Sequence, residues 1–201
     1  MKAKKIILML ALFAGSYTAA YSQGFTLGVK AGHLRTTMPT NFPGIFSRRP
    51  QSGYQIGLFA RIGNKTFIQP ELNYEATSGV IGYDFNTNGT NFTGFSDLKY
   101  RRMDIPILLG HKFVSLPLFN FRGYIGPDFG LKINGSTLTT PILTYEFYRY
   151  KAYDVGAVIG AGIDIANLTF DARYNFGLTQ VNQGFNARLN TFGIAVGFKF
   201  L

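Results

Sequence analysis

The stretch from Tyr150 to Val181 constrains the fold of this chain most, because apolar residues recur at every second position along most of it. From Leu168 to Thr179 each apolar residue is followed by a polar residue or glycine. The segment from Tyr153 to Ile165 keeps the same period of two. This period is typical of a β-strand with one apolar and one polar face. With Ala166 and Asn167 as a tight connection, the sequence predicts a long antiparallel hairpin.

The length of these strands indicates a membrane protein. Strands in soluble sandwiches usually have about five or six residues, whereas a tilted strand needs about 9–11 residues to cross a bilayer. Both segments reach the longer value, and their polar faces are rich in glycine and charge. A soluble lipocalin-like barrel is the alternative, and it would turn its apolar faces inward and need no detergent. The pattern favours a barrel whose apolar face meets lipid.

Six further segments show the same alternation and complete a set of eight strands. Pro70 argues against one of them, because proline cannot donate a ladder hydrogen bond, but the alternation around it is otherwise regular. The connections alternate between long and short, with 78–97 as one long loop. This predicts an all-β, eight-stranded antiparallel up-and-down transmembrane β-barrel, with both termini and the short turns in the periplasm and the long loops outside. The predicted strands are 24–32, 54–62, 66–77, 98–113, 119–133, 153–165, 168–179 and 189–201.

The amino terminus has the features of a secretory signal peptide. Three lysines at positions 2, 4 and 5 precede an apolar run from Ile6 to Ala14, and Ala20-Tyr21-Ser22 offers a cleavage site before Gln23. A membrane anchor helix is the alternative, but this run is too short to span about 30 Å of hydrocarbon. We therefore predict a signal peptide over 1–22, an outer-membrane barrel domain over 23–201, and export to the outer membrane. The chain has no Cys, which excludes a lipoprotein anchor and disulfides.

Composition supports a barrel and limits the partners. The chain has 24 Gly, 20 Phe and 12 Tyr, which suits a barrel with aromatic girdles. It carries 20 Lys+Arg against 10 Asp+Glu, and removal of the signal peptide takes away only three lysines. An exported protein does not normally meet nucleic acid, so the basic surplus predicts acidic lipid headgroups as the partner instead.

The strand positions that are predicted to face inward carry eight positive and seven negative side chains, so we expect a nearly neutral lumen. Buried charges persist only when they are paired and hydrogen-bonded. We expect Glu71 to pair with Arg173, Arg122 or both, inside a closed lumen; a wet lumen with screened charges is the alternative. The predicted charge network comprises Lys30, Glu71, Arg122, Asp128, Asp171 and Arg173.

A second group of charges lies on the lipid-facing parity at the outer ends of the strands. Lys99 and Arg101 open one predicted strand, and Arg149 and Lys151 precede another, with tyrosines nearby. Basic and aromatic residues at this depth suit the headgroup layer. The sequence predicts a rim that binds lipopolysaccharide phosphates, with ordinary snorkelling of the side chains as the alternative.

No motif in the chain predicts a metal, cofactor or catalytic site. The glycine-rich segment Gly156–Gly162 contains fragments of helix-dependent motifs, but it lies on a strand, so we interpret it as small lumen-facing residues of a narrow barrel. The only histidines, His33 and His111, fall at opposite ends of the predicted barrel. A lipid-modifying enzyme would have only His33 as its base at the outer rim. We therefore predict a non-catalytic protein.

Seven segments together resemble the PorT-like outer-membrane β-barrel proteins of Bacteroidota, a family that is also similar to small OmpX-type barrels. The resemblance implies a cell-surface barrel with a structural or loop-mediated role, or alternatively an accessory component of type IX protein secretion that contacts secretion-system proteins. It also implies recognition by the barrel assembly machinery through a terminal aromatic residue; Phe198 and Phe200 fit this, although Leu201 is last. The segments are GFTLGVKAGHL, YQIGLFARI, FIQPELNYEATSG, YRRMDIPILLGHKF, GYIGPDFGLKING, YDVGAVIGAGIDI and FDARYNFGLTQVN.

Overall fold

A computed structural model describes residues 24–37, 45–47, 51–87, 90–135, 152–179 and 188–200 of the 201-residue chain. The predicted signal peptide and two of the predicted rim residues, Arg149 and Lys151, lie outside this part of the chain. Within the described ranges, no helix is both long and apolar enough to cross a membrane.

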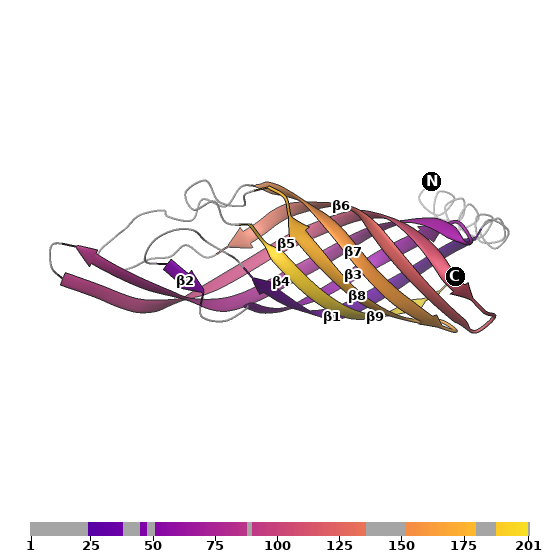
Figure 1. The fold of residues 1–201 in the computed structure, drawn as a ribbon, viewed down its shortest axis with the longest axis horizontal. Helices are drawn as coiled ribbons and strands as arrows, with labels where there is room; N and C mark the ends of the chain where they lie inside the picture. Colours follow the sequence, from indigo (N-terminus) through magenta and orange to yellow (C-terminus); the bar gives the residue numbers. More distant parts are fainter. Residues whose placement is uncertain are drawn as a thin grey trace, which may run out of the picture.

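In the described part of the chain, eight long strands and one short strand make up the fold (Figure 1). Their lengths follow from the alternating segments of the sequence, since each long strand contains at least ten residues. This is enough for a tilted strand to cross a bilayer. The strands are β1 (Phe25–Thr37), β2 (Ile45–Ser47), β3 (Gln51–Ile62), β4 (Thr66–Thr87), β5 (Thr90–Ser115), β6 (Phe119–Gly135), β7 (Tyr153–Ile165), β8 (Leu168–Gly177) and β9 (Asn190–Lys199).

The eight long strands close into a barrel. The sheet order is β2-β4-β3-β1-β9-β8-β7-β6-β5, and β4 also pairs with β5, which joins the two ends. Every pairing is antiparallel. Closure removes the exposed sheet edges that a membrane would not tolerate. The predicted eight-stranded antiparallel barrel is confirmed.

The two faces of the wall are inverted relative to a soluble protein. Large apolar side chains point outward; Leu58 is 52% exposed, Ile125 57% and Val196 50%. The inward side chains are largely polar or charged and are buried, among them Arg122 and Asp104, both at 0% exposure. This contradicts the soluble lipocalin-like alternative, because the apolar area of this barrel lies outside and only lipid would cover it.

One segment that was predicted to be a loop forms a pair of strands instead. Residues 78–97 were expected to form a loop, but β4 and β5 stay paired from Ser78↔Lys99 to Thr87↔Thr90. We call residues 79–87 and 90–98 the hairpin arm; it extends well beyond the other strands (Figure 1). At about 3.4 Å per residue the arm is roughly 30 Å long. Its many Asn, Gly and Thr residues indicated a loop, yet Asn88-Gly89 is also the pair most favoured in two-residue hairpin turns.

The other strand boundaries move by a few residues. β1 continues to Thr37 instead of stopping near residue 32, and β3 begins at Gln51. β2 adds three residues that pair with Ile81–Tyr83 of the arm. The short connections 63–65, 116–118 and 166–167 lie together at the end of the barrel opposite the arm. We call this end the turn end and the other the arm end.

The fold predicts heat-modifiable migration. A closed barrel keeps its ladder hydrogen bonds in cold detergent, so we expect unboiled and boiled samples to run at different positions in a denaturing gel. Circular dichroism of the unboiled sample should be of the β type. Extraction of the native protein into buffer without detergent would contradict the fold's inverted faces.

Candidate functional site

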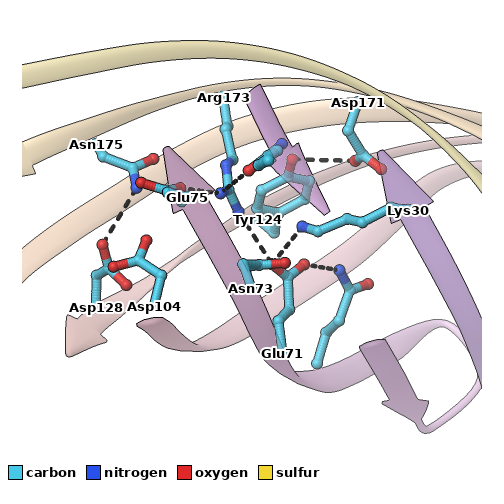
Figure 2. A network of polar contacts seen from close by, with 12 residues as sticks. Lys30, Glu71, Asn73, Glu75, Asp104, Tyr124, Asp128, Asp171, Arg173 and Asn175 are labelled. Carbon is cyan, nitrogen blue, oxygen red and sulfur yellow. Dashed lines mark hydrogen bonds and ion pairs between the residues drawn. The ribbon is translucent and has the colours of Figure 1, made fainter. Parts of the chain in front are cut away.

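The centre of the lumen holds a network of ion pairs that links three strands (Figure 2). Glu71 on β4 accepts hydrogen bonds from Lys30 on β1 and from Arg173 on β8, the latter at 3.0 Å between Nη1 and Oε2. Arg173 also donates to Glu75 at 3.1 Å and to Gln55. All these side chains are buried. The network therefore ties together strands that do not all neighbour each other in the sheet.

Arg102 on β5 is the hub of the arm-end half of the lumen. Its guanidinium lies 3.0 Å from Glu75, 3.1 Å from Asp104, 2.9 Å from Asp154 and 3.7 Å from Asp128. One cation thus contacts four carboxylates from β4, β5, β6 and β7. Because Glu75 also binds Arg173, this half is continuous with the central network. A guanidinium suits such a position, since its planar fork donates several hydrogen bonds in fixed directions.

A second cluster fills the half near the turn end. Arg122 on β6 is fully buried and contacts Asp164 at 3.3 Å and Asp171 at 2.8 Å, and it donates to the Thr169 hydroxyl. Arg61 on β3 lies 2.8 Å from the other oxygen of Asp164. Each aspartate of this cluster therefore meets at least one guanidinium, as buried carboxylates require.

Glycines on the inner wall provide the room for these long side chains. A Cβ added to Gly162 would lie 2.8 Å from the Arg122 guanidinium, and one added to Gly160 would lie 2.5 Å from the Tyr124 ring. Both glycines belong to β7, whose inner face carries Asp154, Gly156, Val158, Gly160, Gly162 and Asp164. The glycines of the segment Gly156–Gly162 face the lumen, as interpreted from the sequence, and a side chain at Gly160 or Gly162 would displace the charge cluster, whereas Ile159 and Ala161 face outward.

Two phenylalanines narrow the lumen at the turn end. Phe59 and Phe67 point inward, each only 2% exposed. They flank the Arg61 guanidinium, whose carbon lies 5.7 Å and 4.9 Å from the two ring centres. Cation–π contacts of this kind add stabilisation to a desolvated cation. Together with the ion pairs above them, these rings fill the cross-section of the barrel, as expected for eight strands.

The structure divides the six residues of the predicted charge network into two groups. Lys30, Glu71 and Arg173 are in direct contact, and Asp128 joins them through Arg102 and Glu75. Arg122 and Asp171 lie in the cluster near the turn end, so Arg122 pairs with Asp164 and Asp171 and not with Glu71. Arg102 and Glu75 lay on the predicted inward parity, but no feature of the sequence marked Arg102 as the hub.

The filled lumen predicts that the protein does not conduct. Purified protein in planar lipid bilayers should give no stable, large conductance steps, because arginine and phenylalanine side chains occupy the path that water would need. An open porin that is purified and inserted in the same way is the positive control for insertion. Regular large steps from this barrel would favour the wet lumen instead.

Lys99 and Arg101 of the predicted rim lie on the outer face of β5 near the arm end, and both are exposed. They line a hollow of about 480 Å³ together with His33, Ser52, Tyr54 and Ser78. The hollow therefore combines two cations, an imidazole and several hydroxyl groups. Its position on the lipid-facing side distinguishes it from the charged lumen.

The histidines lie apart, as expected from the sequence. His33 contacts Ser52 at 3.4 Å between Nε2 and Oγ, and His111 contacts Thr66 at 2.9 Å near the turn end. Within the described ranges, neither imidazole has a hydrogen bond to a carboxylate that would orient it as a general base. The described residues also contain no group of three or more metal-ligating side chains arranged to hold an ion.

Two solved structures and one family model are similar to this chain. The structure is similar to Ail, the attachment invasion locus protein of Yersinia pestis, solved with the heparin analogue sucrose octasulfate (12% identity, 88% of this chain and 99% of that chain covered, TM-score 0.45). It is also similar to Neisserial surface protein A (15% identity, 88% and 97% covered, TM-score 0.49). No curated protein matches the sequence. A family model described as outer membrane protein beta-barrel domain matches residues 18–183, and the chain therefore belongs to this family of outer-membrane barrels.

Proposed function

We propose that this outer-membrane barrel is non-catalytic and acts at the cell surface through its hairpin arm. The observation that carries the proposal is the contrast between a filled lumen and a long paired arm at one end (Figure 1). A barrel whose interior is occupied by ion pairs has no path for a solute. The barrel then serves as a rigid support that holds the arm away from the membrane.

The arm has the form of a protein-binding element. Along residues 90–98, β5 pairs with β4 on one side, and its pairing with β6 begins only at Tyr100 within the described ranges. A strand paired on one side presents backbone N–H and C=O groups to which an extended segment of a partner can add. On the other side of the arm, β2 already covers Ile81–Tyr83. The edge of β5 is therefore the proposed contact.

The proposal places the arm outside the cell and both termini in the periplasm. The short connections gather at the turn end, as in bacterial barrels whose periplasmic turns are short. A signal peptide over 1–22 and delivery by the barrel assembly machinery are part of this proposal. The chain contains no Cys, so single-cysteine variants can report the orientation directly.

Cysteine labelling tests the orientation. An impermeant maleimide should label Thr90→Cys in intact cells, because Thr90 lies at the tip of the arm. Asn64→Cys, in a short connection, should react only after the outer membrane is permeabilised. The reverse pattern would overturn the proposed orientation.

Photo-crosslinking in living cells tests the arm as a contact site. A photoreactive amino acid at Thr93 or Ser96 should give discrete protein adducts, and the same group at Lys65 should not. The barrels of all three variants must still show the heat-dependent gel shift. If no position along the arm gives an adduct in folded protein, the proposed function is wrong.

An accessory role in type IX protein secretion is the second candidate. It is supported by the resemblance of segments such as GYIGPDFGLKING to PorT-like proteins. A strain that lacks the gene should then retain secreted cargo in the periplasm, and the wild-type gene should restore release. Normal secretion in the deletion strain would remove this candidate.

A further inference from the structure

Strand register aligns a set of basic and small polar residues on the lipid-facing side of the barrel. Two adjacent rows run across β1, β3, β4 and β5 near the arm end, and all their side chains point outward. Neither row contains an acidic residue. We call these eight residues the basic rows: Arg35, Ser52, Ser78 and Lys99 form one, and His33, Tyr54, Ala76 and Arg101 form the other.

The basic rows enclose a hollow because Ser52, Ser78 and Ala76 are shorter than the side chains at the two edges of the rows. Ser52, Ser78 and Ala76 lie between the β1 residues of the rows and the cations Lys99 and Arg101 of β5, and the hollow of about 480 Å³ opens above them. With about 4.8 Å between strands, the two edges of a row are roughly 14 Å apart. This spacing fits a phosphorylated headgroup better than a single small ion.

On β1, β3, β4 and β5 the basic rows lie just beyond the apolar band. The next outward row toward the turn end consists of Ala31, Ile56, Tyr74 and Met103, none of which is charged. The rings of Tyr54 and Tyr74 lie 6.5 Å apart between their centres, tilted by 46°, across this boundary. Tyrosine beside cations marks the headgroup level of a membrane.

Two apolar grooves on the outer wall lead away from the basic rows. One, of about 750 Å³, lies below the rows and extends onto β9; it is lined by Ile56, Leu72 and Val196 among others. The other, of about 550 Å³, begins at His33 and passes Ala161 and Ala172 on β7 and β8. Both are lined almost entirely by apolar side chains, which suits acyl chains and not a polar polymer.

We propose that the basic rows bind the phosphate group of an outer-leaflet lipid, with its acyl chains in the two apolar grooves. Arg101 lines the hollow and can bind phosphate oxygens through paired N–H groups, and Lys99 adds a point charge. The hydroxyls of Ser52 and Ser78 can donate to the remaining oxygens. The inference rests on the proposed orientation, which puts the arm end at the outer leaflet, but not on the hairpin arm as a contact site.

Lipid retention by the purified, folded barrel tests the site. The probe is lipid A carrying its phosphates, measured by native mass spectrometry after transfer into detergent. The double variant Lys99→Gln/Arg101→Gln should retain it at least about tenfold more weakly, which corresponds to about 1.4 kcal/mol. Lys65→Gln, an exposed cation at the turn end, should retain it like the wild type. Equal retention by the wild type and the double variant would overturn the proposal.

A variant that keeps all the charges distinguishes a shaped binding site from separate cations that snorkel to the membrane surface. Ser78→Leu keeps every cation but fills the hollow between them, so retention should also fall by about tenfold. If Ser78→Leu retains lipid like the wild type, the cations act only as separate snorkelling side chains and the site is disproved.

Two competition experiments identify the source of the phosphate. Dephosphorylated lipid A should be lost more readily, and millimolar inorganic phosphate should not displace the phosphorylated lipid, because it cannot use the grooves. Retention of the dephosphorylated lipid at the wild-type level would show that phosphate is not recognised. Displacement by inorganic phosphate alone would assign the hollow to a free anion and refute the lipid site.

Discussion

Replacing Glu71 with alanine should lower the free energy of unfolding by about 3–5 kcal/mol. Glu71 is 5% exposed and is the only carboxylate in direct contact with Lys30 among the described ion pairs. Its removal leaves the Lys30 ammonium buried without an opposite charge and takes one of the two carboxylates from Arg173. Breaking a buried pair from one side costs more than the pair itself contributes, because the remaining charge stays desolvated.

Urea-induced unfolding in lipid vesicles measures this loss. The double variant Glu71→Ala/Lys30→Met should recover part of the stability, because it removes the stranded ammonium as well. Asn64→Ala, in a short connection at the turn end, is the control and should change the midpoint little. An unfolding midpoint of Glu71→Ala equal to that of the wild type would show that the lumen is wet and its charges are screened.

Replacing Arg102 with methionine should destabilise the barrel by at least a similar amount, about 3–5 kcal/mol. Arg102 contacts four buried carboxylates, and methionine would leave Asp104, Asp128 and Asp154 without their guanidinium. Negative charges from four strands would then repel one another within one narrow cross-section. We expect slower folding into vesicles and a lower unfolding midpoint at neutral pH.

The dependence of this defect on pH identifies its cause. Acidification adds protons to the unpaired carboxylates and removes their repulsion, so the difference in stability between wild type and Arg102→Met should shrink as the pH falls. Arg101→Met is the matched control, because Arg101 is the preceding residue but faces lipid. It should leave stability nearly unchanged at every pH. A gap that stays constant on acidification would point to lost packing instead of unpaired charge.

The alternation of apolar and polar residues along each strand determined which side chains face the lumen and which face lipid. The period of two from Leu168 to Thr179 places Asp171 and Arg173 inside and Phe170 outside, whatever the neighbouring strands are. The length of the strands indicated that they span a membrane. The alternation of long and short connections indicated the number of barrel strands. These features are local, so the sequence was sufficient to predict the fold and the charged lumen.

The partners of the lumen charges were decided by the tertiary structure. Parity gives the side on which a residue lies, but its height depends on the register between strands and on the tilt that closure imposes. The β5–β6 register shifts between Arg101 and Arg102, and Arg102 lies level with Glu75. No local pattern encodes such a shift.

Register between strands also explains why the sequence did not reveal the basic rows or the hairpin arm. Lys99 and Arg101 were recognisable as basic rim residues, but only pairing across β1, β3 and β4 places Arg35, His33 and Ser52 in the same rows. The hairpin arm depends on a pairing of residues 79–87 with 90–98, whose composition also suits a loop. Residue type and spacing thus determined which way each side chain faces, whereas contacts between strands decided which side chains meet, because register and tilt are properties of the closed barrel.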